Sequence, residues 1–206
     1  MTRLVAFGCS CTYGYGLPDC FTPPDVPGTI PSKFAWPSLV AEKLNLECDN
    51  TSRPGASNFE ILDNILNYQF EESDTVVVMW SFHERDMLFE NNLERTYLHI
   101  GNVGELAEKW LSIHSDADFR MRSWFNMYTA YLHLSSLNVK FYFLNLLFDQ
   151  RFHDLRPKWS EKITFLKPNL NYLSKQYPKA LDNKHPGLIP HMLVAKRILE
   201  EIRNNE

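Results

Sequence analysis

A serine near one end of the chain and a histidine near the other have the types and surroundings needed for nucleophilic chemistry. Ser10 lies in the segment Gly8–Thr12, directly after a short apolar run, and small residues flank it. Asp182 precedes His185 by three residues. A serine nucleophile needs a base to take its proton, and that base needs a carboxylate to orient it. A three-residue offset within a turn places a carboxylate against one imidazole nitrogen and leaves the other facing a cleft.

Four cysteines, at positions 9, 11, 20 and 48, could instead carry thiol or metal chemistry. A cysteine phosphatase needs an arginine that closes the loop shortly after its thiol, and the first arginine after Cys11 is Arg53. A zinc site on these cysteines stays an alternative, although their spacing matches no paired zinc-binding knuckle. The segment after Phe7 also lacks the spacing of loops that bind phosphate or dinucleotides. We therefore expect no metal or other cofactor, and we interpret Cys9 and Cys11 as small buried residues.

Composition and charge exclude several classes of protein. The chain has 206 residues, and we expect a single domain over residues 1–206. Its net charge of −4 offers no basic excess for binding a phosphate backbone, so nucleic acid is not an expected partner. No apolar run approaches the roughly 20 residues of a membrane span, and the run after Arg3 is too short for a signal peptide. Cysteines confined to the first quarter favour reduced thiols and a cytoplasmic protein.

Short apolar runs alternate with amphipathic segments along the chain. The runs predict strands at Leu4–Phe7, Asp74–Trp80 and Val139–Leu147, with a weaker candidate at Leu46–Thr51. The amphipathic segments predict helices at Trp36–Leu44, Asn58–Phe70 and Pro190–Ile202, and two more within Glu105–Leu137 that break near Ser115–Asp118. This alternation favours a parallel sheet with helices on both faces.

Two segments do not fit the alternating pattern. Phe21–Phe34 carries four prolines and few periodic residues, so we expect a long loop over the site. Asp149–Leu181 is charged and interrupted by proline, which predicts an irregular region with short helical turns.

Polar loops follow three of the predicted strands. These loops are Gly8–Leu17, Asn50–Asn58 and Ser81–Asp86. In an open parallel sheet, ligands bind beyond the carboxyl ends of the strands. We therefore expect the three loops to form one site, with the hydroxyl of Ser10 as its most reactive group.

In combination, these motifs resemble the SGNH (GDSL-like) hydrolase family over nearly the whole chain. Gly8–Ser10 followed by Thr12 is similar to the first block of the family, and Gly55 is similar to the glycine of the second block. The segment Asp182–Pro186 is similar to the last block, which supplies the carboxylate and the base. Within the family, the chain is most similar to small proteins found in bacteriophage genomes.

The resemblance implies both a fold and a set of roles. The fold is α/β, a three-layer α/β/α sandwich with a mostly parallel flavodoxin-like sheet. Ser10 is the implied nucleophile and His185 the implied base, with Asp182 as its orienting carboxylate. The amides of Ser10 and Gly55 are the implied oxyanion donors.

The third block of the family differs in this sequence. That block is Gly-x-Asn-Asp and its asparagine points at the oxyanion, whereas Trp80–His83 contains no asparagine. In the first block, Cys9 and Cys11 stand where aspartate and leucine are usual. Asn58 and Ser81 could replace the missing donor, and we expect Asn58, because an amide donor has a fixed direction. The alternative is that Asn58 only starts the helix beside a Ser57 cap.

Further polar residues are candidates for substrate contact. Ser81, His83 and Arg85 lie where the third strand meets the site, and we predict that they bind substrate. The alternative for the charged loop is a solvated set of mutual salt bridges. Arg53 is expected on the surface rather than at an anionic substrate, and His153–Asp154 is a rival base.

These residues favour a serine hydrolase that cleaves a carboxylic ester. The expected substrate is a small-molecule or carbohydrate ester, with an O-acetyl or short acyl group on a carbohydrate as the first candidate. A binding or interaction module that keeps the fold but catalyses little is the alternative, and the missing third-block asparagine supports it. Transfer of the acyl group to a second alcohol is a third possibility.

Overall fold

The computed structural model of the chain describes residues 2–23, 26–89, 95–98, 105–146, 150–166 and 170–204. Its centre is a five-stranded sheet in the order β4-β1-β5-β8-β9, and every neighbouring pair is parallel. The strands are β1 (Arg3–Phe7), β4 (Glu47–Asn50), β5 (Thr75–Trp80), β8 (Lys140–Asn145) and β9 (Phe165–Leu166). In chain order this is the 2-1-3-4-5 arrangement of flavodoxin-like sheets.

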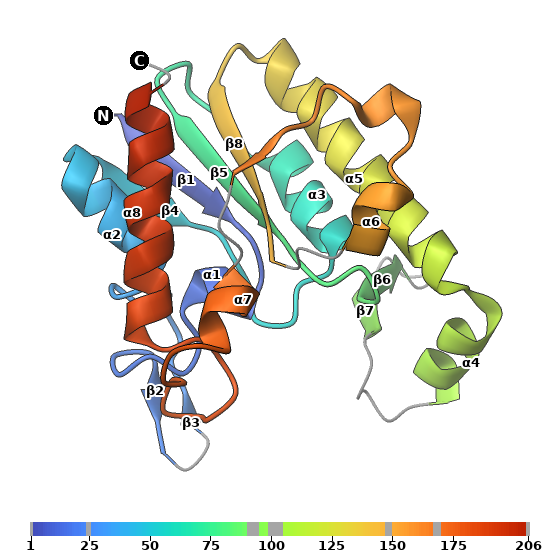
Figure 1. Ribbon diagram of the computed structural model, residues 1–206, viewed down its shortest axis with the longest axis horizontal. Coiled ribbons are helices and arrows are strands. Elements are labelled where there is room, and N and C mark those ends of the chain that lie inside the picture. The colour runs from blue at the N-terminus through green and yellow to red at the C-terminus, as the bar shows by residue number, and fades with distance from the viewer. Residues whose placement is uncertain are drawn as a thin grey trace.

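Two pairs of helices cover the sheet (Figure 1). α2 (Trp36–Leu44) packs beside α8 (Leu188–Asn204), and α3 (Asn58–Asn67) packs beside α5 (Asp116–Ser136). The two pairs lie on opposite faces of the strands. This arrangement confirms the predicted three-layer α/β/α sandwich with its parallel flavodoxin-like sheet.

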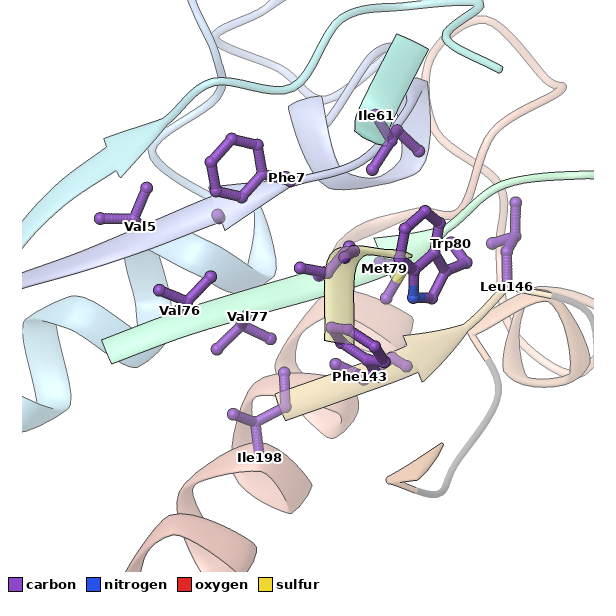
Figure 2. Close-up of a cluster of buried hydrophobic side chains, with 14 of the residues drawn as sticks. Val5, Phe7, Ile61, Val76, Val77, Met79, Trp80, Phe143, Leu146 and Ile198 are labelled. Carbon is purple, nitrogen blue, oxygen red and sulfur yellow. The ribbon is translucent and has the colours of Figure 1, made fainter. Parts of the chain in front are cut away.

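The core lies on both faces of the sheet, which explains the continuous apolar runs in the sequence. Figure 2 shows Ile61 of α3 and Ile198 of α8 on opposite sides of β5. Buried side chains of the three central strands fill the space between the helices: Val5, Phe7, Val76, Val77, Met79, Trp80 and Phe143. A rigid core of this kind fixes the carboxyl ends of β1 and β5, where the candidate site begins.

The predicted helices are all present, but the first or last residue differs for α3 and α8. α2 has the predicted bounds, and the long segment divides into α4 (Glu105–Ile113) and α5, with the Ser115 hydroxyl capping the second helix. α8 begins two residues before Pro190 and ends two after Ile202. α3 ends at Asn67 rather than at Phe70, because Tyr68 and Phe70 turn back to pack against Phe7.

Several short strands were not predicted. The expected loop at 21–34 contains an antiparallel pair, β2 (Phe21–Thr22) and β3 (Val26–Pro27), and a second pair is formed by β6 (Asp86–Phe89) and β7 (Arg95–Leu98). The irregular region contains short helical turns, as predicted: α6 (Gln150–Asp154), α7 (Leu170–Ser174) and a 3₁₀ turn at Lys158–Ser160. The edge strand β9 in the same region was not predicted. The predicted end of the strand at Leu147 lies outside the described residues. Within the described ranges, no helix is long and apolar enough to cross a membrane.

Candidate active site

Ser10 is the first residue of α1 (Ser10–Tyr13), the short helix that follows β1. Cys9 before it is extended, with φ −103° and ψ −158°, so the chain turns sharply between strand and helix. Gly8 is required there, because a Cβ at this position would lie 2.1 Å from the Thr12 hydroxyl oxygen. The turn places a nearly buried serine side chain at the carboxyl edge of the sheet.

The segment around His185 is a tight, internally bonded loop. Lys179 and Pro186 form an isolated antiparallel bridge, and the Ala180 amide donates to the His185 carbonyl at 3.0 Å. Within the loop, the Asp182 carboxylate accepts hydrogen bonds from the amides of Lys184 and His185, both at 3.0 Å. The loop therefore fixes the carboxylate and the imidazole relative to each other before any contact with Ser10.

The structure brings the three predicted side chains together, although they come from opposite ends of the chain. Nε2 of His185 lies 2.9 Å from Oγ of Ser10, and Nδ1 of His185 lies 2.5 Å from Oδ2 of Asp182. The carboxylate fixes the tautomer, so Nδ1–H donates to Asp182 and Nε2 accepts from the Ser10 hydroxyl. Partial burial acts to raise the pKa of Asp182, but the bonds from the His185 ring and the two amides outweigh it and lower that pKa. Asp182 is thus ionised at neutral pH.

Two residues of the loop after α1 hold this arrangement, and no motif in the sequence pointed to them. Gly16 has φ +86°, and a Cβ on it would lie 2.8 Å from the Asp182 carboxyl carbon. The Gly16 carbonyl accepts a hydrogen bond from the Leu181 amide at 2.9 Å. The ring of Tyr15 packs on the imidazole of His185, with 5.0 Å between centroids. Gly16 therefore lets the His185 loop approach, and Tyr15 restricts the ring.

The loop that carries Gly55 is tied to the Ser10 loop. The Arg53 amide donates to the Gly8 carbonyl at 3.2 Å, and the Asn50 side chain donates to the Thr12 carbonyl at 3.0 Å. Gly55 has φ +84° and open space where a Cβ would be. Among the described residues, no acceptor is found for the amides of Ser10 or Gly55. These two amides are available to a ligand.

Asn58 has different partners from those that an oxyanion donor needs. Its side-chain oxygen accepts from the Ser81 amide at 2.7 Å, and its side-chain nitrogen donates to the Ser81 carbonyl at 3.3 Å and to the Ser123 hydroxyl at 3.0 Å. The residue is buried at the start of α3. Both amide protons of Asn58 are thus used to join α3, β5 and α5, and its predicted oxyanion role stays an untested prediction.

The predicted substrate-binding residues after β5 have separate environments. His83 is buried, with Nε2 at 2.9 Å from Asp116 of α5 and Nδ1 at 3.7 Å from Glu84, so both ring nitrogens face carboxylates. Arg85 is half-buried and donates to the Ser81 hydroxyl at 3.2 Å. The geometry therefore favours Arg85 over His83 for contact with a ligand, while Ser81 is buried beneath it.

The alternatives raised by the sequence find little support in the described residues. Arg53 pairs with the buried carboxylate of Glu60, in keeping with a structural role. His153 lies among the rings of Trp124, Phe152 and Phe165 rather than at Ser10. All four cysteines are free, Cys9 and Cys11 are buried as predicted, and no group of three metal-binding side chains occurs among the described residues.

A second histidine, His191 of α8, lies near His185 but bonds to the start of α2 rather than to the three candidate catalytic residues. Its Nδ1 accepts a hydrogen bond from the Trp36 amide at the start of α2, at 3.2 Å, and the side chain is fully buried. Burial, aided by the nearby His185, lowers the pKa of His191 to about 3. The imidazole is therefore neutral in the folded protein and joins α8 to α2.

We expect His191 to make stability depend on pH on the acid side of neutrality. Its pKa in the unfolded chain is near 6.5, so below that pH the unfolded chain binds a proton that the folded protein excludes, and stability falls until about pH 3. From pH 7 to pH 5 this group costs about 2 kcal/mol. Urea unfolding of the wild type and of His191→Asn, which keeps an acceptor for the Trp36 amide, measures it. Equal pH slopes for the two proteins would contradict the assignment.

Comparison with solved structures finds a similar fold in several esterases and lipolytic proteins. The chain is similar to an acetyl xylan esterase (Est2A) from the rumen bacterium Butyrivibrio proteoclasticus, with 15% identity and a TM-score of 0.61 over 98% of this chain and 64% of that one. It is also similar to a member of the lipolytic protein G-D-S-L family from Veillonella parvula DSM 2008, with 14% identity, a TM-score of 0.53 and 97% of both chains covered.

A third similar structure is a lipase/acylhydrolase from Enterococcus faecalis, with 17% identity, a TM-score of 0.55, and 100% of this chain and 97% of that one covered. The chain spans about two thirds of the length of the acetyl xylan esterase. No protein-family model and no curated protein matches the sequence. The likeness therefore shows the class of fold alone, a three-layer α/β/α sandwich that these esterases and lipolytic proteins share; the similarity to small bacteriophage proteins stays a prediction.

Proposed function

We propose that the protein is a serine hydrolase that cleaves a carboxylic ester. The observation that carries the proposal is the chain of contacts from Asp182 through His185 to Ser10, at 2.5 Å and 2.9 Å. Ser10 attacks the ester carbonyl while His185 takes its proton, and the protonated imidazole then gives that proton to the leaving alcohol. Asp182 keeps the ring in the productive tautomer and stabilises the imidazolium.

The tetrahedral intermediate needs donors for its oxyanion. The free amides of Ser10 and Gly55 are our candidates, because their loops are bonded to each other and Gly55 faces open space. A single donor of this kind is worth about 3–4 kcal/mol in the transition state. The side chains of Ser81 and Asn58 stay candidates for a third donor.

The substrate class is part of the proposal. Solved structures with this fold include an acetyl xylan esterase and a carbohydrate esterase, which supports an ester on a carbohydrate or a similar small molecule. We propose no cofactor and no nucleic-acid partner. The four free cysteines are in keeping with a reducing, cytoplasmic location and with one domain that needs no disulfide.

Labelling with a fluorophosphonate tests the mechanism, because this probe reacts with serines that a neighbouring base activates. We expect wild-type protein to be labelled at Ser10, and labelling to be lost in Ser10→Ala and in His185→Gln. Denatured wild-type protein is the control for nonspecific reaction. Circular dichroism confirms that each variant is folded. Folded wild-type protein that resists the probe would contradict the proposal.

A binding module with little activity is the second candidate. The absence of an asparagine in Trp80–His83 favours it, because the usual third oxyanion donor is then missing, and Asn58 already bonds to Ser81 and Ser123. Unlabelled, folded protein would support this reading. If enzyme that has not been treated with the probe passes the acyl group of an ester substrate to an added alcohol rather than to water, the result would instead indicate acyl transfer.

A further inference from the structure

Arg85 differs from the other partly buried arginines that the structure describes. Its Nη1 donates to the Ser81 hydroxyl at 3.2 Å, and its guanidinium lies 4.7 Å above the ring of Phe82. Within the described ranges, no carboxylate lies within 4.0 Å of it. The neighbouring acids are turned elsewhere: Glu84 contacts His83, and Asp86 accepts from the Met87 amide. The remaining N–H groups of the guanidinium have no acceptor there.

Other arginines show what this chain does with a partly buried cation. The buried or half-buried ones outside the site have compensating oxygens: Arg3 pairs with Asp74, Arg53 with Glu60 and Arg120 with Asp116, while Arg156 donates to the carbonyls of Ser160 and Ile163. Removing a cation from water without such a partner costs free energy. Arg85 bears that cost at the edge of the candidate active site.

The position of Arg85 connects its charge to the nucleophile. β5 pairs with β1 as far as Phe7 and Val78, and the side chain of Ser81 after β5 contacts that of Cys9, the residue before Ser10. The Arg85 charge acts to lower the pKa of both Cys9 and Cys11, the two residues that flank Ser10. The pKa of Cys11 is nevertheless raised, first by its contact with the Cys9 thiol and then by burial.

We propose that Arg85 forms an anion-binding subsite beside Ser10, so that the ester substrate carries a carboxylate, phosphate or sulfate group. This inference rests on the proposed esterase function. The planar guanidinium suits two parallel hydrogen bonds to such a group. Phe82 and Ser81 hold the guanidinium in place before the ligand arrives, which lowers the entropy that binding costs.

Two pairs of test esters place the anion on either side of the scissile bond. On the acyl side, the 4-nitrophenyl monoester of succinate is compared with 4-nitrophenyl butyrate. On the alcohol side, 4-acetoxybenzoate is compared with 4-acetoxybenzamide. We expect wild-type kcat/KM to favour the anionic member of one pair by about 10- to 100-fold, because a charge-assisted pair of hydrogen bonds is among the stronger polar contacts. The preference should shrink as salt is added.

Arg85→Gln removes the charge and should abolish this preference, because kcat/KM for the anionic ester falls relative to that for its neutral partner. Arg85→Lys keeps the positive charge but lacks the two parallel N–H donors of the guanidinium, so it should keep part of the preference for the anionic ester. Arg203→Gln, which changes the net charge equally at the exposed end of α8, is the matched control and should keep the full preference. An equal loss of kcat for neutral and anionic esters in Arg85→Gln would overturn the subsite, because Arg85 would then act on the reaction itself.

Binding to Ser10→Ala separates failure of the subsite from failure of the proposed function. Calorimetric titration of this variant with the same ester pairs gives affinities without turnover. One outcome is that Ser10→Ala binds an anionic ester more tightly than its neutral partner, in a way that depends on Arg85, while the wild type cleaves neither pair. That outcome overturns the esterase proposal and leaves the subsite standing. Cleavage of neutral esters, with no preference and no Arg85-dependent binding, overturns the subsite alone.

Discussion

Replacing Asp182 by asparagine is expected to lower kcat by about 10⁴-fold. The carbonyl oxygen of the introduced asparagine can still accept the amides of Lys184 and His185, which bond to Oδ1 in the wild type, so the loop keeps its shape. The side-chain NH₂ group then faces Nδ1 of His185, where Oδ2 was an acceptor. A donor at this place makes Nδ1 the accepting nitrogen and puts the ring proton on Nε2. An imidazole in that tautomer cannot take the proton of Ser10.

Steady-state hydrolysis of a neutral ester by Asp182→Asn measures this effect. The thermal unfolding temperature should stay close to that of the wild type, because the hydrogen bonds inside the loop survive. Asp154→Asn is the matched control, since Asp154 belongs to the rival pair in α6, and it should keep activity within a few-fold. Strong loss in Asp154→Asn with near-normal activity in Asp182→Asn would transfer the role to His153.

The sequence predicted the parts of this molecule that depend on long, regular patterns. β1 and β5 are buried on both faces and therefore appear as uninterrupted apolar runs, and α2 carries an amphipathic repeat with its predicted ends. The grouping of Ser10 with the Asp182–His185 turn was implied by the resemblance to the SGNH family, to which the residue types and their order along the chain led. The strands and α2 depend on local patterns of residues. The Ser10 group depends on a motif, since a serine nucleophile requires a base and a carboxylate.

What could not be predicted depends on contacts between distant parts of the chain. β9 has two residues, too few for any period to show, and it becomes a strand only because β8 offers a free edge. Gly16 looked like an ordinary turn residue, and its closeness to Asp182 exists only in the fold. Arg85 is distinguished by the lack of a carboxylate partner among the residues that the structure describes, which no stretch of sequence reveals.

For Asn58, the sequence suggested a role as an oxyanion donor, but the hydrogen-bond partners of its side chain do not favour that role. We expect Asn58→Ala to reduce the free energy of unfolding by about 2–4 kcal/mol, since the amide and the carbonyl of Ser81 would both lose their side-chain partner in a buried place. The loss should appear as a lower midpoint in urea unfolding. Ser123→Ala removes only one of the Asn58 bonds and should cost about 1 kcal/mol.

Kinetics on folded Asn58→Ala then decide between the two roles. A residue that only holds the end of β5 leaves kcat within a few-fold at temperatures where the variant is folded, apart from small displacements of Ser81. An oxyanion donor predicts about a 10²-fold loss of kcat with little change in KM, because that contact forms mainly in the transition state. Ser81→Ala run beside it distinguishes the candidate donors: if its kcat falls further than that of Asn58→Ala, the third donor is the Ser81 hydroxyl. The unfolding midpoint and the kcat of Asn58→Ala thus test the two roles of this side chain independently. We expect a clearly lower midpoint and a kcat within a few-fold of the wild type.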